Sequence, residues 1–294
     1  MTAHSISEAM TQLSALNGPA ACIAGTLMSL LSLNLFTDSE NGRNCKHDGD
    51  GTMKGWRTRI GFLVPPGNPT VEPEMAELTP QGVSVHFTRM HAEGPAGTHT
   101  GQEQRNLSQV ESIPACVKLL AMVSPSVIVM AHTATNYTLG EARVAALVAE
   151  MEAISNARFI TAFGSAMAAF SALGIRRIAY ATPYSADMTA QGKRHLEKCG
   201  MSVVSSGHLA NVRNIYEENS ERAYAIGRQV DHPEAEAIFL SGVGMPTLDA
   251  LQPLEEDTGK PVISAASAMM WNALRTAGVN QGFDGYGKLL SGKV

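Results

Sequence analysis

Two short stretches of the sequence combine the pattern of a buried strand with residues that can do chemistry. Residues 128–137 read IVMAHTATNY and residues 238–247 read IFLSGVGMPT. In each stretch an apolar run breaks into small and polar residues, as expected where a buried strand opens into a loop. Ligands of α/β proteins bind outside the carboxyl ends of the strands, so both loops are candidate site loops.

His132, at the end of the first run, is the residue best suited to acid–base chemistry, because imidazole titrates near neutral pH. The backbone N–H groups of Thr133 and Ala134 can bind a carboxylate where a strand turns into a helix. Thr135 and Asn136 add side-chain donors. A purely structural histidine, followed by Thr and Asn side chains that only cap the helix, is the alternative.

Gly242, in the second run, carries no side chain that could move a proton or attack a substrate. We expect it to leave room for a bulkier substrate or for a water. The neighbouring N–H groups of Val243 and Gly244 would then form an oxyanion pocket. A cleft that has lost catalysis, with Gly242 as permissive backbone only, is the alternative.

A third candidate segment, VPPGNPTVEPEM, precedes both runs at 64–75. Asn68 offers two amide donors from a loop shaped by prolines, among them Pro66. A simple Gly-Asn-Pro turn, which needs no ligand, is the alternative.

From residue 56 onward, β-rich runs alternate with helical patterns. We predict strands at 59–65, 83–90, 126–132, 158–162, 177–183, 201–209, 237–243 and 261–265. Helices are predicted at 104–123, 140–153, 164–173, 186–199 and 217–231. Several strands are continuous apolar runs, which is typical of strands buried on both faces of a parallel sheet. The alternation predicts an α/β fold.

The two site runs also begin similar units. Each is followed by a second strand, RFITA or PVISA, and then by a helix rich in Ala, Ser and Met. The simplest explanation is a two-fold repeat of an α/β unit. Two such units facing each other would bring both loops to one cleft.

Composition excludes several function classes. With 44% hydrophobic and 17% charged residues the chain is globular, and its net charge of −5 without a Lys/Arg run predicts no nucleic-acid or membrane partner. The four cysteines have irregular spacing, so we expect neither a disulfide framework nor a metal site. Reduced thiols predict a cytoplasmic protein.

Residues 1–55 differ from the rest and are predicted to be a poorly ordered extension. The apolar part, 19–36, contains Pro, Gly, Ser and Asn and is marginal for a membrane span. The polar, Gly-rich stretch 37–52 reads as a linker. We expect the natural start to be Met53; an export signal is the alternative, but no Lys or Arg precedes the apolar run.

Three motifs carry a family resemblance. They are VPPGNPTVEPEM, LSGVGMPTLDALQPLEEDTGKPVISAASAMMWNALRTAG (240–278) and GYGKLLSG (285–292). The chain resembles the maleate cis–trans isomerases and arylmalonate decarboxylases of the aspartate/glutamate racemase superfamily over about 57–292. The resemblance implies two similar domains with parallel sheets, related by a pseudo-two-fold axis, with the active site between them. The predicted domains are 56–160, completed by about 266–294, and 161–265.

The resemblance also implies that neither metal nor organic cofactor is needed and that a cysteine from each half flanks the substrate. His132 and Gly242 stand in those two places here. Cys116 and Cys199 lie inside helical patterns, away from the loops.

Further substrate contacts follow from the same resemblance. It places Asn68 on the substrate carboxylate, and Asn136, Tyr184 and, less securely, Asn211 at positions that contact the substrate. For Tyr184, a half-buried ring with its hydroxyl in water is the alternative. His91, His99, His195 and His208 are expected to be surface or loop residues.

The predicted function is therefore a cofactor-independent isomerase or lyase, most similar to maleate isomerase. Its substrate would be a small carboxylic or dicarboxylic acid, reacting through an enediolate with His132 as acid/base. The alternatives are a decarboxylase similar to arylmalonate decarboxylase, or an inactive carboxylate-binding protein. Two-base racemisation does not fit, because Gly242 supplies no second base. A homodimer is one assembly that the family implies.

Overall fold

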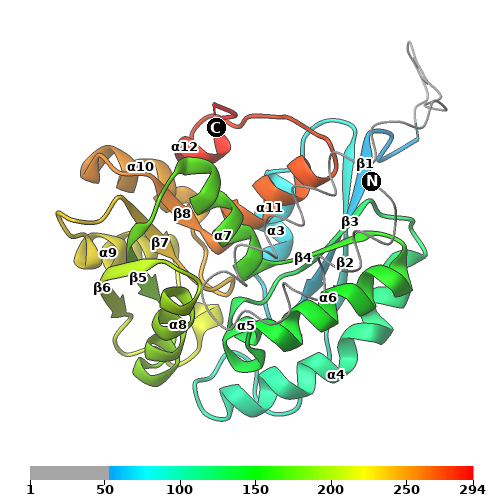
Figure 1. Cartoon of the computed structure of the whole chain (residues 1–294), viewed down its shortest axis with the longest axis horizontal. Coiled ribbons are helices and arrows are strands. Elements are labelled where there is room, and N and C mark those ends of the chain that lie inside the picture. Colours follow the sequence, from blue (N-terminus) through cyan, green and yellow to red (C-terminus); the bar gives the residue numbers. More distant parts are fainter. Residues whose placement is uncertain (1–52, 294) are drawn as a thin grey trace, which may run out of the picture.

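The computed structural model describes residues 53–293 of the 294-residue chain (Figure 1), so nearly all of the predicted N-terminal extension lies outside the described residues. All eight predicted strands form within one to three residues of the predicted limits. They are β1 (Thr58–Val64), β2 (Val83–Arg89), β3 (Val127–Met130), β4 (Arg158–Thr161), β5 (Arg177–Thr182), β6 (Ser202–His208), β7 (Ala237–Leu240) and β8 (Val262–Ser264).

The strands build two four-stranded sheets whose orders are β2-β1-β3-β4 and β6-β5-β7-β8. Adding four to each number of the first order gives the second, so the two sheets repeat one topology. All pairings are parallel. The predicted α/β class with two similar parallel-sheet units is confirmed.

Helices connect the strands in both sheets (Figure 1). The five predicted helices form as α4 (Gln102–Ala121), α6 (Glu141–Ser155), α7 (Ala162–Leu173), α8 (Ala186–Lys198) and α9 (Ser220–Val230), and the Ala/Ser/Met-rich segment forms α11 (Ala265–Thr276). No limits were predicted for α10 (Leu248–Thr258), although a helix was expected after the second site run, or for four short elements. The short ones are α3 (Val71–Glu77), α5 (Thr133–Leu139), α12 (Gly287–Leu290) and the 3₁₀ turn η1 (Ile215–Glu217). Both α3 and α10 contain a proline, which interrupts the helical pattern in the sequence.

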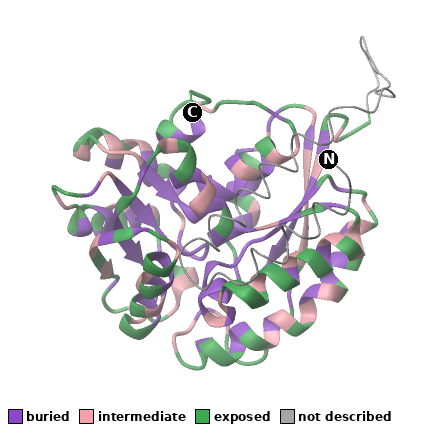
Figure 2. Cartoon of the chain, in the orientation of Figure 1, coloured by how far each residue is buried: buried purple, intermediate pink, exposed green. Residues whose placement is uncertain are grey.

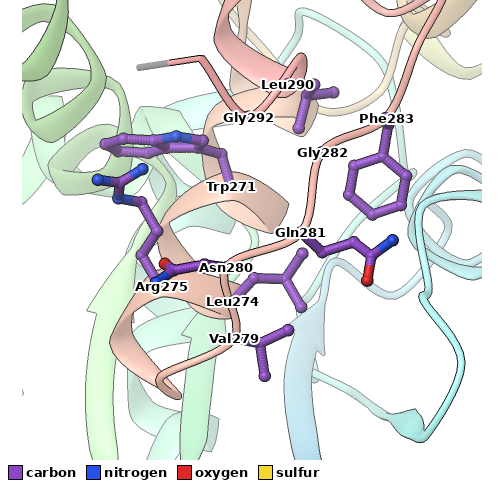
Figure 3. A pocket seen from close by; sticks show the side chains of 10 residues that line it. All are labelled: Trp271, Leu274, Arg275, Val279, Asn280, Gln281, Gly282, Phe283, Leu290 and Gly292. Carbon is purple, nitrogen blue, oxygen red and sulfur yellow. The ribbon is translucent and has the colours of Figure 1, made fainter.

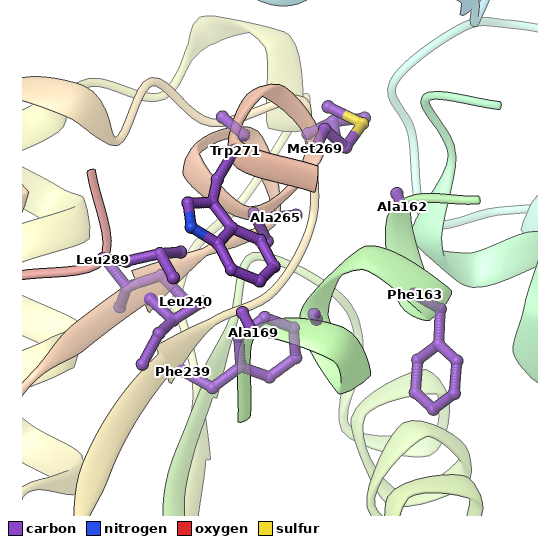
Figure 4. Packing of buried hydrophobic residues seen from close by; sticks show 14 of the residues in the cluster. Ala162, Phe163, Ala169, Phe239, Leu240, Ala265, Met269, Trp271 and Leu289 are labelled. Atoms are coloured by element: carbon purple, nitrogen blue, oxygen red, sulfur yellow. The ribbon is translucent and has the colours of Figure 1, made fainter. Parts of the chain in front are cut away.

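The central strands form the core, and the outer faces of the helices meet solvent (Figure 2). Between the sheets, α7 packs against α11, and α11 also contacts β3, β4 and α3 of the first half. Figure 4 shows Trp271 and Met269 of α11 in the same apolar layer as Ala169 of α7 and Phe239 of β7. The helix that follows the last strand of the second sheet therefore covers part of the first. The predicted domain limits stay a prediction.

No helix among residues 53–293 is long and apolar enough to cross a membrane. The same residues contain no group of three or more His, Cys, Asp or Glu side chains that could hold a metal ion.

Candidate active site

The loops that follow β1 and β7 are in direct contact, although they come from different sheets. The Asn68 amide donates a hydrogen bond to the Val243 carbonyl (2.8 Å), and the Thr70 hydroxyl donates to the Gly244 carbonyl (3.0 Å). The Asn68 side-chain oxygen accepts from the N–H groups of Thr70 and Val71 and thereby caps the start of α3. These bonds leave one amide hydrogen of Asn68 for a ligand.

A second connection joins α5 to the β7 loop. The hydroxyl groups of Tyr137 and Ser241 lie 3.0 Å apart, and the Tyr180 hydroxyl donates to that of Tyr137 (3.3 Å). Burial raises the pKa of Tyr137 to about 12, so its hydroxyl remains neutral at physiological pH. The predicted convergence of the two halves at their strand ends is thus a set of specific side-chain contacts.

His132 follows β3 by two residues and stands just before α5, with 9% of its surface exposed. Its Nδ1 lies 2.6 Å from the Thr135 hydroxyl. No residue within 53–293 hydrogen-bonds to Nε2. In the tautomer with the proton on Nδ1, the ring donates to Thr135 and presents Nε2 as an acceptor.

The ionisation of His132 is set by its surroundings. Burial, and secondly the positive charge of Arg105, lower the pKa of His132 to about 4. The ring is therefore neutral at pH 7 and can accept a proton there.

The first turn of α5 contains two buried polar atoms without partners. They are the Thr133 hydroxyl and the side-chain oxygen of Asn136, whose amide group donates to Thr161 (3.3 Å). Buried polar groups in native proteins almost always have a hydrogen-bond partner or a water. Ala134 is fully buried in the same turn. This cluster of unsatisfied groups beside His132 is what a polar ligand would complete.

Tyr184 occupies the space beside Gly242. Its ring is 3% exposed, and burial raises its pKa well above the ordinary value. The Tyr184 hydroxyl lies close to Thr133 but without the geometry of a hydrogen bond. A Cβ atom placed on Gly242 would stand 3.0 Å from that hydroxyl and 3.1 Å from the Pro183 ring.

We expected space for a substrate or a water beside Gly242. At the position of a Cβ atom that space is not open, because Pro183 and Tyr184 crowd it. Gly242 also has φ +98, a backbone conformation that favours glycine. The loop is shaped for a residue without a side chain.

Pro66 and Asn211 are the remaining predicted substrate contacts. The Pro66 carbonyl accepts a hydrogen bond from Arg89 (3.2 Å), and the residue is half-buried. Asn211 is exposed, with a left-handed backbone (φ 56). Their contact with a substrate stays a prediction.

Sequence reasoning missed Tyr216 of η1. Its ring lies close to glycines of three separate loops, because Cβ atoms placed on Gly67, Gly97 and Gly244 would stand 3.2, 2.7 and 3.0 Å from it. The Gly97 carbonyl accepts a hydrogen bond from the Ile215 N–H (2.9 Å). The Tyr216 ring thus packs between the β1 and β7 loops, and nothing in its polar segment of sequence indicated this.

Arg105, near the start of α4, is the second residue that the sequence did not reveal. It is 8% exposed, and its guanidinium donates to the carbonyl groups of Thr98 and Thr100. Its charge acts on both His132 and Tyr216. A buried cation beside a neutral imidazole favours an anionic ligand.

Two features outside this region are separate from it. A cavity of about 320 Å³ lies against α11 and the C-terminal segment, where Trp271, Arg275, Gln281 and Phe283 line it (Figure 3), and no predicted site residue does. His195 is buried on the inner face of α8, 4.6 Å from the Phe163 ring between ring centres, so its expected surface position is wrong.

Comparison with known proteins agrees with this arrangement. The chain matches the arylmalonate decarboxylase family over residues 60–290. It is 30% identical to maleate isomerase of Nocardia farcinica, over 79% of this chain and 95% of that protein. It is 27% identical to arylmalonate decarboxylase of Bordetella bronchiseptica, over 78% and 95%.

A solved structure shares the two-domain fold. It is that of a cysteine-to-serine variant of the Nocardia farcinica maleate cis–trans isomerase with a covalently bound succinylcysteine intermediate. Its TM-score is 0.71 at 28% identity, over 81% of this chain and 99% of that chain. Because the family match spans residues 60–290 and the two repeated parallel sheets agree with it, the chain belongs to the arylmalonate decarboxylase family, whose relatives here are isomerases and a decarboxylase.

Proposed function

We propose that this enzyme is a cofactor-independent isomerase or lyase, similar to maleate isomerase, which acts on a small carboxylic or dicarboxylic acid through an enediolate. His132 is its acid/base. The observation that carries the proposal is the state of this ring: it is buried and neutral, Thr135 fixes Nδ1, and Nε2 has no partner within residues 53–293.

The substrate carboxylate would bind at the first turn of α5. The N–H groups of Thr133 and Ala134, the unpartnered Thr133 hydroxyl and the Asn136 side chain provide polar contacts there. The remaining amide hydrogen of Asn68 would add a donor from the β1 loop. The buried charge of Arg105 favours binding of the anion.

Proton transfer would then follow from the neutral state of His132. In a substrate whose α-carbon is saturated and is bonded to a C=C group, the Nε2 atom takes the α-proton and the electron pair moves into a conjugated enediolate. The N–H groups of Val243 and Gly244 stabilise the charge that develops on the oxygens. Return of the proton to the far carbon of the conjugated system shifts the double bond towards the carboxylate and leaves the ring neutral again, so this order needs no protonated histidine at the start.

Decarboxylation is the second candidate, and the match to the arylmalonate decarboxylase family favours it. In that reaction CO₂ leaves first, and the enediolate then takes a proton from His132. The ring must be protonated for this step, which its low pKa opposes in the absence of substrate. A bound dianion beside the ring would raise that pKa.

We infer that neither half supplies a catalytic thiol. The cysteine adduct of the Nocardia farcinica isomerase requires sulfur. The family resemblance of the β7 loop motif puts Gly242 where a cysteine would stand, and Gly242 carries none. Of the cysteines in residues 53–293, Cys116 is buried in α4 and Cys199 ends α8. We also propose that the enzyme binds a small carboxylate as substrate, forms a homodimer and is located in the cytoplasm.

NMR spectra recorded in D₂O test the reaction class directly. The enzyme is incubated separately with maleate, with substituted malonates and with unsaturated dicarboxylates. New alkene signals with deuterium incorporation indicate isomerisation, and loss of CO₂ with a deuterium at the α-carbon indicates decarboxylation. Ligand line broadening without any product would show a binding protein and overturn the proposal, as would the absence of any interaction with all three classes.

A further inference from the structure

Glu74 of α3 is a buried acid that the proposed chemistry does not use. It is 6% exposed, and one carboxyl oxygen accepts hydrogen bonds from the N–H groups of Thr247 (2.6 Å) and Leu248 (3.1 Å). Both donors stand at the start of α10, on the opposite half of the molecule. The other carboxyl oxygen is buried and has no partner.

This contact replaces a missing helix cap. Thr247 is the N-cap residue of α10, but its side chain makes no capping hydrogen bond. The first N–H groups of a helix have no partner inside the helix and need one from outside. Glu74, 173 positions earlier in the chain, provides that partner.

The segment held in this way belongs to the proposed site. Asn68 and Thr70 donate hydrogen bonds to the carbonyl groups of Val243 and Gly244. Glu74 accepts hydrogen bonds from the N–H groups of Thr247 and Leu248, a few residues later. In a trans peptide the C=O and N–H point in opposite directions, so fixing the Val243 carbonyl also fixes the direction of the Gly244 N–H. Residues 68–74 thus hold both ends of the segment that carries the oxyanion donor.

We propose that Glu74 is a positioning residue, whose carboxyl group holds the start of α10 and so keeps the Gly244 N–H aimed at the developing negative charge. The inference rests on the proposed function. Preorganised donors stabilise a transition state because they need not reorient as charge develops. Loosening α10 therefore lowers kcat more than it weakens substrate binding.

Variants at Glu74 separate the effect of its hydrogen-bond acceptor from the effect of its negative charge. Burial raises the pKa of Glu74 to about 7, so the uncharged carboxyl group already serves as acceptor for part of the time. Glu74→Gln retains an acceptor oxygen and should keep kcat within about threefold. Glu74→Met retains the volume but removes the acceptor, and kcat should fall about tenfold or more with KM changed less than about threefold.

A matched control distinguishes positioning from general stability. Asn219 caps α9, which has 11 residues as α10 does, through its own hydrogen bond to the Arg222 N–H (3.0 Å). Asn219→Ala should lower the urea concentration at the midpoint of unfolding, as N-cap losses do, without changing kcat. If Asn219→Ala lowers kcat as much as Glu74→Met does, or if Glu74→Met keeps full kcat, the proposal is wrong.

Amide NMR without substrate keeps this inference separate from the proposed reaction. In Glu74→Met the Gly244 amide signal should move, and the Thr247 and Leu248 amides should exchange with solvent about tenfold faster; Glu74→Gln should leave both unchanged. An unmoved Gly244 signal overturns the positioning role even in an active enzyme. Should Glu74→Met fail to fold, Glu74→Asp, one methylene shorter, provides the same comparison.

Discussion

The two strand ends that meet in this protein differ in what they contribute. The β3 end presents side chains: the neutral ring of His132 and the unpartnered groups of Thr133 and Asn136. The β7 end presents backbone, because Gly242 has no side chain and its surroundings would crowd one. A repeated fold has thus produced two unequal halves of the candidate site.

The difference extends to how each end is held. The β3 end is fixed from within its own half, through Thr135 on His132 and Thr161 on Asn136. The β7 end is fixed from the other half, through Asn68, Thr70 and Glu74. Acid–base chemistry needs a placed side chain, whereas an oxyanion pocket needs placed N–H groups, and the two holding arrangements match those needs.

Removing the ring of His132 should have the largest effect. We expect His132→Ala to lower kcat by about 10²- to 10⁴-fold, as loss of a general acid/base does, while substrate affinity changes less than about threefold. Steady-state kinetics and calorimetric titration measure the two quantities. His208, exposed at the end of β6, provides the control, since His208→Ala should leave both unchanged. Unchanged turnover in His132→Ala would remove the contrast between the two ends.

The pH dependence of stability should separate the buried groups of the two regions. The pKa of His132 falls to about 4 in the folded protein, so its contribution to stability is present above its ordinary value of 6.5 and is lost as pH falls towards 4. The pKa of Glu74 rises to about 7, so its contribution is present below its ordinary value of 4.5 and is lost as pH rises through 7. Each amounts to about 3 kcal/mol, and the two oppose each other.

Single variants reveal each contribution in turn. Between pH 7 and pH 4, Glu74→Gln should lose about 3 kcal/mol more stability than the unsubstituted protein does, and His132→Ala should lose about 3 kcal/mol less. Urea unfolding at several pH values gives these differences, in which all other titrating groups cancel. Parallel stability profiles for the three proteins would show that neither group is perturbed as the structure indicates.

A side chain at position 242 should cost stability for two reasons. Gly242→Ala would force a positive φ on alanine and crowd Tyr184 and Pro183, at a cost of about 2–3 kcal/mol. Gly259 also has a positive φ, +67, but nothing within 4 Å of a Cβ atom. Gly259→Ala should therefore cost only about 1–2 kcal/mol. Equal losses in urea unfolding would mean that the space beside Gly242 is open after all.

The smallest effect is expected for one hydrogen bond between the halves. Thr70→Val removes the bond to the Gly244 carbonyl and should cost about 1 kcal/mol, together with a moderate loss of kcat. Thr79→Val removes a comparable bond to the Met75 carbonyl, 2.6 Å long and within one half. It should cost similar stability but no kcat, as measured by urea unfolding and steady-state kinetics. An equal change of kcat in both variants would contradict the special role of the contact between halves.

The sequence predicted those parts of the molecule that depend on local pattern. All eight strands were found because short β-rich runs, several of them continuously apolar, are recognisable without knowing the strands that they pair with. His132 was found because an ionisable residue ends one of those runs. The motifs of the β1 and β7 loops were identified by their resemblance to the family.

The parts that could not be predicted depend on distant contacts. No role was predicted for Glu74, because only its contact with α10 of the other half gives it one. Arg105 is a polar residue that folding buries near His132, and the half-buried Tyr216 packs against the β7 loop. Likewise, no local pattern revealed that Pro183 and Tyr184 occupy the space beside Gly242.

The position of α11 has a consequence for synthesis of the chain. The first sheet has all its strands once Thr161 has been made, yet α11, which covers β3 and β4, begins only at Ala265. A nascent chain that emerges from the ribosome therefore exposes that apolar surface during more than 100 further additions, by the difference between these two positions. Chaperones that recognise exposed apolar surface would therefore bind this protein mainly during that interval.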